Sequence, residues 1–353
     1  MKRLILLGAG HAHVEVLRSF AAAPPPQTHV TVVSPYKAVP YTGMLPGVVS
    51  GRYSLREASI DAAVLANRAG ADFVEASSLS VDRQLKRVRC DNGADISYDL
   101  LSINIGAVAR RPLSISDEMQ VIATKPAEPF IAALERSIPP AVTVIGGGYG
   151  GIELAAALAY RGAAVTVIAG RDGLAPGAPD MARRMIERRL AARAVVVIAG
   201  ADAVGADASG VGLKDGRTVA AQTLVLAAGV TPPPLIATLG LPTDARGFLR
   251  VGATLQSDGD PDVFAAGDCA SVGTGLAKAG VFAVREAPVL AANLRAALAG
   301  ASAAKFRPQS DYLSILSFWP DGAVAIRGRL AAEGRWADRW KEAIDRSFVA
   351  RYR

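Results

Sequence analysis

Two glycine-rich turns, each between an apolar strand and a helix-like segment, constrain the fold of this chain more than any other feature. The first, Gly8 to Gly10, follows the apolar run Leu4 to Leu7, and the second is a full G-x-G-x-x-G at Gly146, Gly148 and Gly151. In such a strand, turn and helix the glycines permit close backbone approach, and the N–H groups at the helix start can hold a pyrophosphate. One copy is often a chance glycine loop, but two copies predict two nucleotide-binding units.

A buried strand that ends in glycine follows each turn. Residues 98–107 read YDLLSINIGA, and residues 223–231 read TLVLAAGVT. This pairing of turn and closing strand indicates an internal duplication of a dinucleotide-binding domain. The first copy departs from the pattern because His13 stands where a third glycine normally allows the helix to pack closely on the strand.

The composition is that of a folded protein, since 51% of the residues are hydrophobic and 20% are charged. The net charge of +7 suits an anionic cofactor, an anionic membrane surface or a nucleic acid. No basic tract with interleaved aromatic residues occurs, so we expect no nucleic-acid partner. No apolar run approaches the roughly 20 residues of a membrane span, and the N-terminal run is too short for a signal peptide. We therefore expect a cytoplasmic protein, either soluble or peripheral on the inner face of the membrane.

The two cysteines, Cys90 and Cys269, lie far apart in the sequence. They form no C-x-x-C pair, so neither a local redox disulfide nor a metal site is expected. We interpret Cys269 as a small buried residue beside a glycine turn, with a thiol near a cofactor as the alternative.

In the first unit, Ser34 and Pro35 stand where an acidic residue normally holds a ribose hydroxyl. A serine can make that hydrogen bond less strongly. The loop 36–51, which contains Thr42 and Met44, is long and without periodicity. Such a loop suggests a functional role, with an ordinary surface loop as the alternative.

In the second unit, Glu153 follows the glycines on the helix. It either faces a cofactor ring or offsets the helix dipole from solvent. The next strand ends in Ala169, Gly170 and Arg171, without an acid for the ribose of NAD. Arg171 is a candidate partner for the 2′-phosphate of NADP, and the choice between NADH and NADPH stays open.

A third strand end, near residue 265, delivers Gly267 and Asp268 to a turn before a helix that we expect to begin near 277 or 278. The carboxylate of Asp268 can accept a hydrogen bond from a polyol hydroxyl. The helix start and Lys278 can face a flavin ring edge, where negative charge grows on reduction. The alternative for Lys278 is a solvated lysine.

The C-terminal segment predicts a hairpin at 311–327 and then a helix. Trp336, Trp340, Ile344 and Phe348 recur every fourth residue and form one stripe on that helix, with basic residues on another side. Such a helix can lie on a membrane surface. Because acidic residues dilute its basic face, we favour packing on its own domain or on a second subunit, as in a homodimer.

The order of these motifs resembles the FAD-dependent pyridine nucleotide-disulfide oxidoreductase superfamily, to about Gly300. The disulfide reductases of that superfamily carry a cysteine pair soon after the first turn, and this chain has none there. The resemblance is therefore to the branch that contains the type II NADH dehydrogenases. It is closer still to the flavoprotein module found alone or fused to selenophosphate synthetase. Four segments carry this closer likeness: GAGHAHVEVLRSF, PYTGMLPGVVSG, KAGVFAVREAPVLAANLRAAL and WADRWKEAIDRSF.

The resemblance implies an α/β fold with two Rossmann-like domains and a small C-terminal α+β segment. FAD would bind the domain formed by 1–114 and 240–300, NADH or NADPH the domain 115–239, and 301–353 would form the hairpin and amphipathic helix. Hydride would pass from NAD(P)H to flavin and electrons on to an acceptor, most plausibly a quinone. The alternative is a flavin-binding accessory module of selenium metabolism with little or no NAD(P)H turnover. The family also uses a glutamate near the nicotinamide, which supports that role for Glu153.

We thus predict Glu153 and Lys278 as catalytic residues and no metal site. The predicted cofactor-binding residues are Gly8, Ala9, Gly10, His11, Ala12, Ser34, Pro35, Thr42, Met44, Ile105, Gly106, Gly146, Gly148, Tyr149, Gly150, Gly151, Arg171, Ala228, Gly229, Gly267, Asp268 and Ala279.

Overall fold

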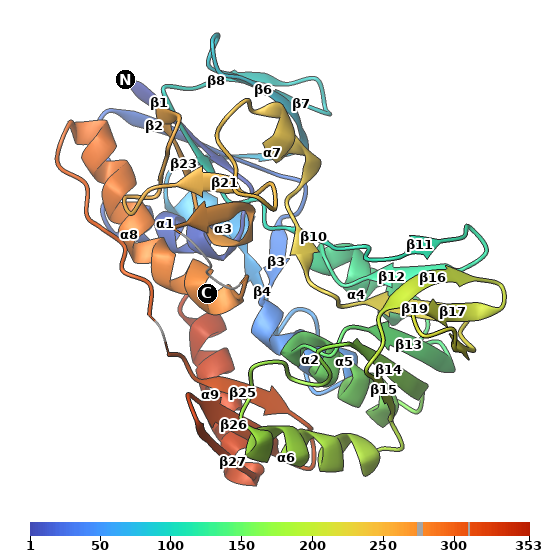
Figure 1. The fold of residues 1–353 in the computed structure, drawn as a ribbon. Helices are drawn as coiled ribbons and strands as arrows, with labels where there is room; N and C mark the ends of the chain where they lie inside the picture. The colour runs from blue at the N-terminus through green and yellow to red at the C-terminus, as the bar shows by residue number, and fades with distance from the viewer. Residues whose placement is uncertain (274–277, 310) are drawn as a thin grey trace.

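The chain forms two α/β units and a small C-terminal sheet with its own helix (Figure 1). The structure is a computed structural model that describes residues 1–273, 278–309 and 311–353. Both units are built on sheets with parallel central strands, as the two glycine turns predict. None of the helices in the described ranges combines the length and apolar content that crossing a bilayer requires.

The first unit contains an eight-stranded sheet in the order β24-β21-β22-β23-β9-β1-β2-β5. Strand β1 (Lys2–Leu7) pairs in parallel with β2 (Thr28–Ser34) and β9 (Leu100–Ile103), and β9 pairs with β23 (Asp260–Ala265). Segments on either side of the second unit therefore share one sheet. Strand β1, in the interior of the sheet, is apolar from Leu4 to Leu7 because both of its faces are covered. The other strands are β5 (Asp72–Glu75), β21 (Leu249–Val251), β22 (Gln256–Ser257) and β24 (Ala270–Val272).

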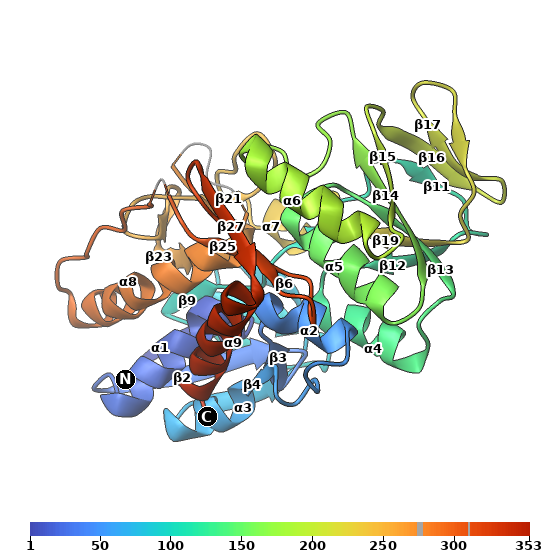
Figure 2. The same ribbon diagram turned by 90° about the horizontal axis from the view of Figure 1, so that it is seen from below.

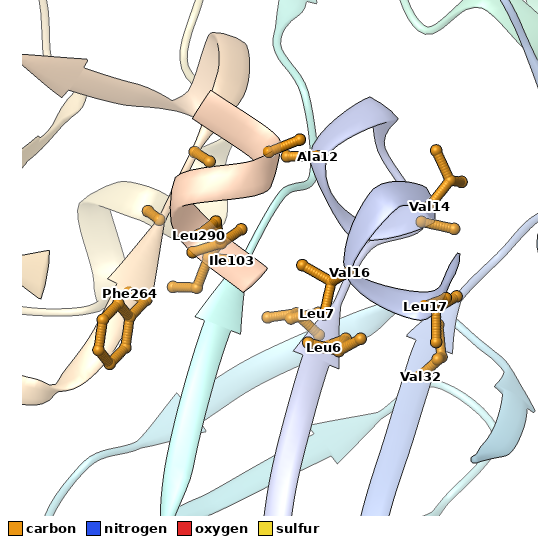
Figure 3. Packing of buried hydrophobic residues seen from close by; sticks show 14 of the residues in the cluster. Leu6, Leu7, Ala12, Val14, Val16, Leu17, Val32, Ile103, Phe264 and Leu290 are labelled. Atoms are coloured by element: carbon orange, nitrogen blue, oxygen red, sulfur yellow. The ribbon is translucent and has the colours of Figure 1, made fainter. Parts of the chain in front are cut away.

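Helices α1 (His11–Ala22) and α8 (Gly280–Ala299) pack against each other on one face of this sheet. Leu17 lies against Val32 of β2, and Leu290 lies beside Ile103 of β9 (Figure 3). The other elements of this unit are β3 (Ala38–Pro40), η1 (Thr42–Met44), α2 (Leu45–Val49), β4 (Ser59–Asp61), α3 (Ala62–Arg68), β6 (Ser78–Asp82), β7 (Arg87–Cys90), β8 (Asp95–Ser97), α7 (Pro234–Thr238) and η2 (Gly267–Cys269).

The second unit contains a five-stranded parallel sheet in the order β12-β19-β13-β14-β15. Three helices cover one face through Phe130, Ile152 and Ile186. A small sheet, β11-β16-β17-β18, covers the other face. The elements are β11 (Ser114–Ile115), β12 (Gln120–Ala123), α4 (Ala127–Arg136), β13 (Ala141–Ile145), α5 (Tyr149–Tyr160), β14 (Ala164–Gly170), α6 (Asp180–Ala191), β15 (Val196–Ala199), β16 (Ala203–Asp207), β17 (Gly210–Leu213), β18 (Thr218–Val219) and β19 (Thr223–Leu226).

The chain crosses between the two units at β10 (Val108–Ala109) and β20 (Val230–Thr231), which pair with each other. The predicted domain limits lie a few residues beyond this pair, and they stay a prediction.

The C-terminal segment forms β25 (Ser314–Ser317), β26 (Ala323–Arg327), β27 (Leu330–Gly334) and helix α9 (Arg335–Ala350). The predicted hairpin is confirmed, and β27 adds a third strand. Figure 2 shows α9 in front of this sheet, reaching towards α1 and α3.

Helix α9 packs on its own chain, but through a different face from the stripe that the sequence singles out. Its Ala337 is buried against Ala323 and Ala325. By contrast, Trp336, Trp340 and Ile344 are exposed at 51%, 46% and 42%. The small alanine allows close contact between helix and sheet, so the indoles are turned outward. The expected packing of the helix on its own chain is confirmed, but the stripe contributes only Phe348 to it, and contact of the three exposed residues with a second subunit stays a prediction.

Arg52 holds α9 against the first unit. Its guanidinium donates to Asp338 Oδ1 at 2.8 Å and to Glu342 Oε2 at 2.9 Å, and its side chain is only 9% exposed. Arg52→Ala leaves the buried carboxylate of Asp338 without this cation, so we expect a loss of about 3 kcal/mol in unfolding free energy, measured by urea titration. Arg87→Ala, which removes an exposed pair with Asp95, should cost at most about 1 kcal/mol. Equal effects of the two substitutions would contradict this interpretation.

Candidate functional site

The first glycine turn is built around Asn104, which follows β9. A Cβ on Gly10 would lie 2.3 Å from Asn104 Oδ1, and a Cβ on Gly8, whose φ is +86°, would lie 2.5 Å from the Asn104 carbonyl oxygen. Asn104 Oδ1 accepts hydrogen bonds from the N–H groups of Ala12 (3.0 Å) and His13 (3.3 Å) at the start of α1. Its Nδ2 donates to the Ala266 carbonyl at 2.6 Å. One buried amide therefore joins the first turn, its helix and the segment before Asp268.

Sequence reasoning missed Asn104 as a site residue, although the NIGA end of the closing strand contains it. The signal was an amide-bearing residue at the strand end that faces the glycine turn. In the second unit an alanine, Ala227, takes the corresponding place, and a Cβ on Gly146 would lie 2.4 Å from its carbonyl oxygen.

His13 explains how the first turn works without a third glycine. Its Nδ1 lies 2.5 Å from the Gly8 carbonyl oxygen and its Nε2 lies 2.8 Å from Ser102 Oγ. Because a carbonyl only accepts, Nδ1 carries the proton and Nε2 accepts from the serine. Complete burial lowers the pKa of His13 to about 4, so the ring is neutral. In the second unit a Cβ on Gly151 would lie 2.3 Å from the Gly146 carbonyl oxygen, which explains why glycine is kept there.

A cavity of about 540 Å³ opens beside the first turn. Its wall comes from the ends of β1, β2 and β9, from the loop before η1, from the start of α4 and from η2. Eleven of the predicted residues line it: Gly8, Ala9, Gly10, His11, Ser34, Pro35, Thr42, Ile105, Gly106, Gly267 and Asp268. Ala12 and Met44 are instead buried in the core, and Ala279 lies beside η2 in a separate small pocket.

Polar groups in the cavity wall include the imidazole of His11, which is partly buried, and an ion pair. The His11 Nε2 atom is buried and has no hydrogen-bond partner among the described residues. Burial lowers the pKa of His11 to about 4. Asp268 forms an ion pair with Lys125, a lining residue that the sequence analysis missed. Glu286 Oε2 accepts the Gly267 N–H at 2.6 Å, and burial raises the pKa of this carboxyl to about 7.

Lys278 does not line this cavity, but it borders the small neighbouring pocket that shares Gly267 and Asp268 with it. Its ammonium donates to the Ala270 carbonyl and lies 4.1 Å from the centre of the Phe248 ring. Burial lowers its pKa. Among the described residues Lys125, rather than Lys278, supplies the lysine of the cavity wall. A role of Lys278 at a flavin stays a prediction.

The second turn leaves the start of α5 open. The positions of Cβ atoms on Gly148 and Gly150 meet no atom within 4 Å, and Tyr149 between them is partly buried. Ala228 and Gly229 follow β19, and Arg110 Nε donates to the Ala228 carbonyl at 3.0 Å. Arg171 follows β14 and is held by Asp202, at 2.7 Å from its Nε.

Glu153 lies where α5 meets the C-terminal segment. Its Oε1 accepts the Ser317 N–H at 2.8 Å, and burial raises the pKa of its carboxyl to about 7. Lys341 of α9 donates to Asp345 Oδ2 at 2.9 Å and to the Gly43 carbonyl at 2.7 Å. Burial lowers the pKa of Lys341, but the charges of Glu153 and Asp345 more than offset this and raise it. The loop that contains Thr42 is thus tied to a buried charged cluster, Glu153, Lys341 and Asp345.

Neither cysteine suits thiol chemistry. Both are free and buried. Burial raises the pKa of Cys269 to about 12, and it also raises the pKa of Cys90. The reactive thiolate form is therefore disfavoured at both positions, and the interpretation of Cys269 as a small buried residue is confirmed.

Two Rossmann-like units, one inserted in the other and each with a glycine turn between strand and helix, define a dinucleotide-binding protein. The model of the pyridine nucleotide-disulphide oxidoreductases matches residues 2–287, and the chain belongs to this family. FAD and NAD(P)H are the cofactor and substrate nucleotide of the family.

Several known proteins are similar to parts of the chain. A demethylphylloquinone reductase of Synechocystis is 34% identical over 134 residues, which cover 36% of this chain and 33% of that protein. An NADH dehydrogenase-like protein of Mycobacterium tuberculosis is 29% identical over 234 residues, 58% of this chain and 56% of that protein. The chain thus spans a third to about half of the length of these relatives. They confirm the resemblance to the NADH dehydrogenase-like branch.

Among solved structures, the sulfide:quinone oxidoreductase of Aquifex aeolicus superposes with a TM-score of 0.81 at 20% identity. The match covers 100% of this chain and 92% of that one. At this identity the likeness shows the fold.

The residues around the first turn fit FAD on two observations. The turn is bare backbone, since a side chain on Gly8 or Gly10 would collide with Asn104, and it borders the cavity. The buried His11 Nε2 in the wall lacks a protein partner among the described residues, and a bound polar group can satisfy it.

Gly10→Ala tests whether the first glycine turn binds FAD. The new Cβ must displace Asn104 Oδ1, which costs the hydrogen bonds to the start of α1. We expect the purified protein to retain FAD about tenfold less well, measured as flavin absorbance per protein after dialysis. Gly212→Ala, whose Cβ has its nearest contact at 3.9 Å, is the matched control and should keep its FAD. Full flavin content in Gly10→Ala would show that the first turn does not bind FAD.

Proposed function

We propose that this protein is an FAD-dependent NAD(P)H oxidoreductase whose acceptor is a quinone. The observation that carries the proposal is the pair of glycine turns on two joined units, the first bordering the cavity and the second leaving the start of α5 open, in a chain whose cysteines are buried and unsuited to thiol exchange. Bound FAD supplies hydride acceptance from a reduced nicotinamide and electron transfer onward.

The residues of the chain bind the two nucleotides and orient them. The backbone of the first turn, from Gly8 to His11, holds a pyrophosphate beside the positive end of α1, and Asp268 accepts hydrogen bonds from hydroxyl groups. The start of α5, at Gly148 and Tyr149, holds the nicotinamide nucleotide in the same manner. These assignments rest on the lining of the cavity beside the first turn and on the open start of α5.

The buried charged cluster supports a quinone as acceptor. Reduction of a quinone to a hydroquinone takes up protons and electrons in equal number. A carboxyl whose pKa is about 7, as burial makes that of Glu153, holds a proton in part of the molecules at neutral pH. Lys341, whose charge acts on this carboxyl, donates to the Gly43 carbonyl beside the cavity-lining Thr42. We assign Glu153 to proton donation on the acceptor side, a role different from the position near the nicotinamide that the family resemblance implies. The similarity to a demethylphylloquinone reductase agrees with this acceptor class.

Anaerobic stopped-flow absorbance of the FAD-loaded protein tests the reaction. We expect NADH or NADPH to bleach the flavin band and a short-tailed quinone to restore it. Gly146→Ala, whose Cβ would lie 2.4 Å from the Ala227 carbonyl oxygen, should keep FAD and lose bleaching. Gly205→Ala, with its nearest contact at 3.8 Å, is the control in the same unit. Bound flavin that neither nucleotide reduces would refute the oxidoreductase proposal.

Glu153→Gln tests the proton donor. A group with a pKa of about 7 carries its proton below that pH and loses it above, so the wild-type rate of reoxidation by quinone should fall as the pH rises through 7. Glutamine cannot release a proton, and we expect reoxidation slowed by about tenfold or more, without this pH-dependent step. Stopped-flow rates on either side of pH 7 measure it. An unchanged profile in Glu153→Gln would remove Glu153 from this role.

We further propose that α9 rests on an anionic membrane, from which a quinone can enter. Trp336 and Trp340 stack at 6.2 Å on its exposed face, beside the exposed Ile344. Arg335 and Arg339 are exposed on the same helix. Indoles flanked by arginines suit the interface between headgroups and acyl chains.

Flotation with vesicles of anionic phospholipid tests this contact. Replacing both Trp336 and Trp340 by serine should weaken vesicle binding by about tenfold, because two partly exposed indoles no longer leave water. Leu85→Ser removes an apolar side chain that is 66% exposed on the distant β6–β7 hairpin, and it should bind as the wild type does. Equal binding of the tryptophan double variant and the wild type would contradict the proposal.

A further inference from the structure

The carboxyl end of β14 carries an arrangement that the sequence alone does not reveal. β14 is the second strand of the unit β13-α5-β14; it ends with Ala169 and Gly170, and Arg171 follows directly. In dinucleotide-binding units the side chain at this strand end distinguishes a ribose 2′-hydroxyl from a 2′-phosphate. An acid favours the hydroxyl and a free arginine favours the phosphate. The end of β14 is followed by an arginine, and it carries no acid.

The neighbouring strand supplies the acid. β15 pairs with β14, with Ala199 opposite Gly170, and the Gly200 N–H donates to the Gly170 carbonyl at 2.9 Å. The loop that follows brings Asp202 back over the end of β14. A Cβ on Gly170 would lie 3.1 Å from Asp202 Oδ1. The carboxylate therefore stands beside the position from which an acidic residue of β14 itself would extend.

Asp202 also holds Arg171. Its Oδ1 accepts the Arg171 backbone N–H at 3.0 Å, and its Oδ2 accepts from Nε at 2.7 Å. A second guanidinium nitrogen lies 2.5 Å from the same oxygen. These hydrogen bonds lower the pKa of Asp202, so the group is ionised at neutral pH. The side chain of Asp202 is still 32% exposed and can accept a further hydrogen bond.

The other charged groups near Asp202 and Arg171 leave the local net charge close to zero. Asp172 follows Arg171 and adds a negative charge, and Lys214 acts on Asp202 as a second cation. The local sum of two carboxylates and two cations is close to zero. A 2′-phosphate would have to displace a carboxylate from Arg171, whereas a hydroxyl can donate to that carboxylate in place.

We propose that Asp202, acting with Arg171, makes the second unit selective for NADH over NADPH by accepting a hydrogen bond from the ribose 2′-hydroxyl. This inference rests on the proposed function, because it concerns the nucleotide that the second unit binds. It assigns specificity to a residue outside the βαβ unit and treats Arg171 as neutralised.

Calorimetric titration of the FAD-loaded protein with ADP-ribose and with 2′-phospho-ADP-ribose measures this choice without turnover. Both ligands lack the nicotinamide. We expect the wild type to bind ADP-ribose about tenfold more tightly, the size of one hydrogen bond to a charged group at a partly exposed site. In Asp202→Asn the amide oxygen can still accept from the Arg171 backbone, but the guanidinium is freed. The preference should fall by about tenfold or reverse.

Asp99→Asn is the matched control. Asp99 accepts from both the backbone N–H and the guanidinium of Arg3, at 2.7 Å and 3.0 Å, in the first unit. Its replacement should leave the ratio of the two affinities unchanged. Arg171→Ala gives a second test, because it should strengthen discrimination against the phosphate.

Three results would overturn the inference: tighter binding of the phosphorylated ligand by the wild type, an unchanged ratio in Asp202→Asn, or binding of neither ligand. ADP-ribose binding with the expected ratio, in a protein whose flavin NADH does not reduce, would refute the oxidoreductase proposal and leave the role of Asp202 standing.

Discussion

The amide of Asn104 is the interaction on which the first unit depends. It sits where three chain segments meet: the glycine turn, the start of α1 and the strand end that leads to Asp268. Its oxygen accepts from the start of α1 and its nitrogen donates to the Ala266 carbonyl, so the amide makes both contacts in only one orientation. A carboxylate would lack the donor to Ala266, and an aliphatic side chain would leave two helix N–H groups without this acceptor. The second unit closes its turn with backbone alone, at Ala227, and it keeps the third glycine that the first unit replaces by His13.

The C-terminal segment that contains β25 and α9 adds a second constraint, because it is bonded to both units. Arg52 and Tyr352 tie it to the first unit, the tyrosine by donating to Glu15 at 3.0 Å. Ser317, at the end of β25, ties the same segment to Glu153 of the second unit. These contacts exclude water from the charged cluster, and that exclusion raises the pKa of Glu153. The ordinary titration of a carboxyl is therefore changed by a segment that begins more than 160 positions away in the chain.

The fold could be predicted because its signals are local. An apolar strand, a glycine turn and a helix lie within about twenty residues of each other, and their repetition gives the two units. The site residues that were missed, Asn104, Lys125 and Lys341, owe their places to contacts between distant segments. A lysine beside a motif gives no local sign of which carbonyl or carboxylate it will meet, and Lys278 turned towards Ala270 and Phe248. The stripe on α9 was recognised correctly as a stripe, but periodicity alone does not say whether such a face lies inward.

The two units also share an ion pair near the end of their second strands, which the glycine motifs do not reveal. In the first unit β2 ends at Ser34, which is paired with Glu75 of the neighbouring strand, and Lys37 lies 2.6 Å from the Glu75 carboxylate. In the second unit β14 ends at Gly170, and the acid after its neighbouring strand, Asp202, holds Arg171. Both units thus place a cation after the second strand and neutralise it with an acid from the next one. The adenosine of FAD carries a free 2′-hydroxyl. The unit that suits FAD therefore uses this layout for a nucleotide without a 2′-phosphate, and its recurrence in the second unit favours the same kind of ligand there.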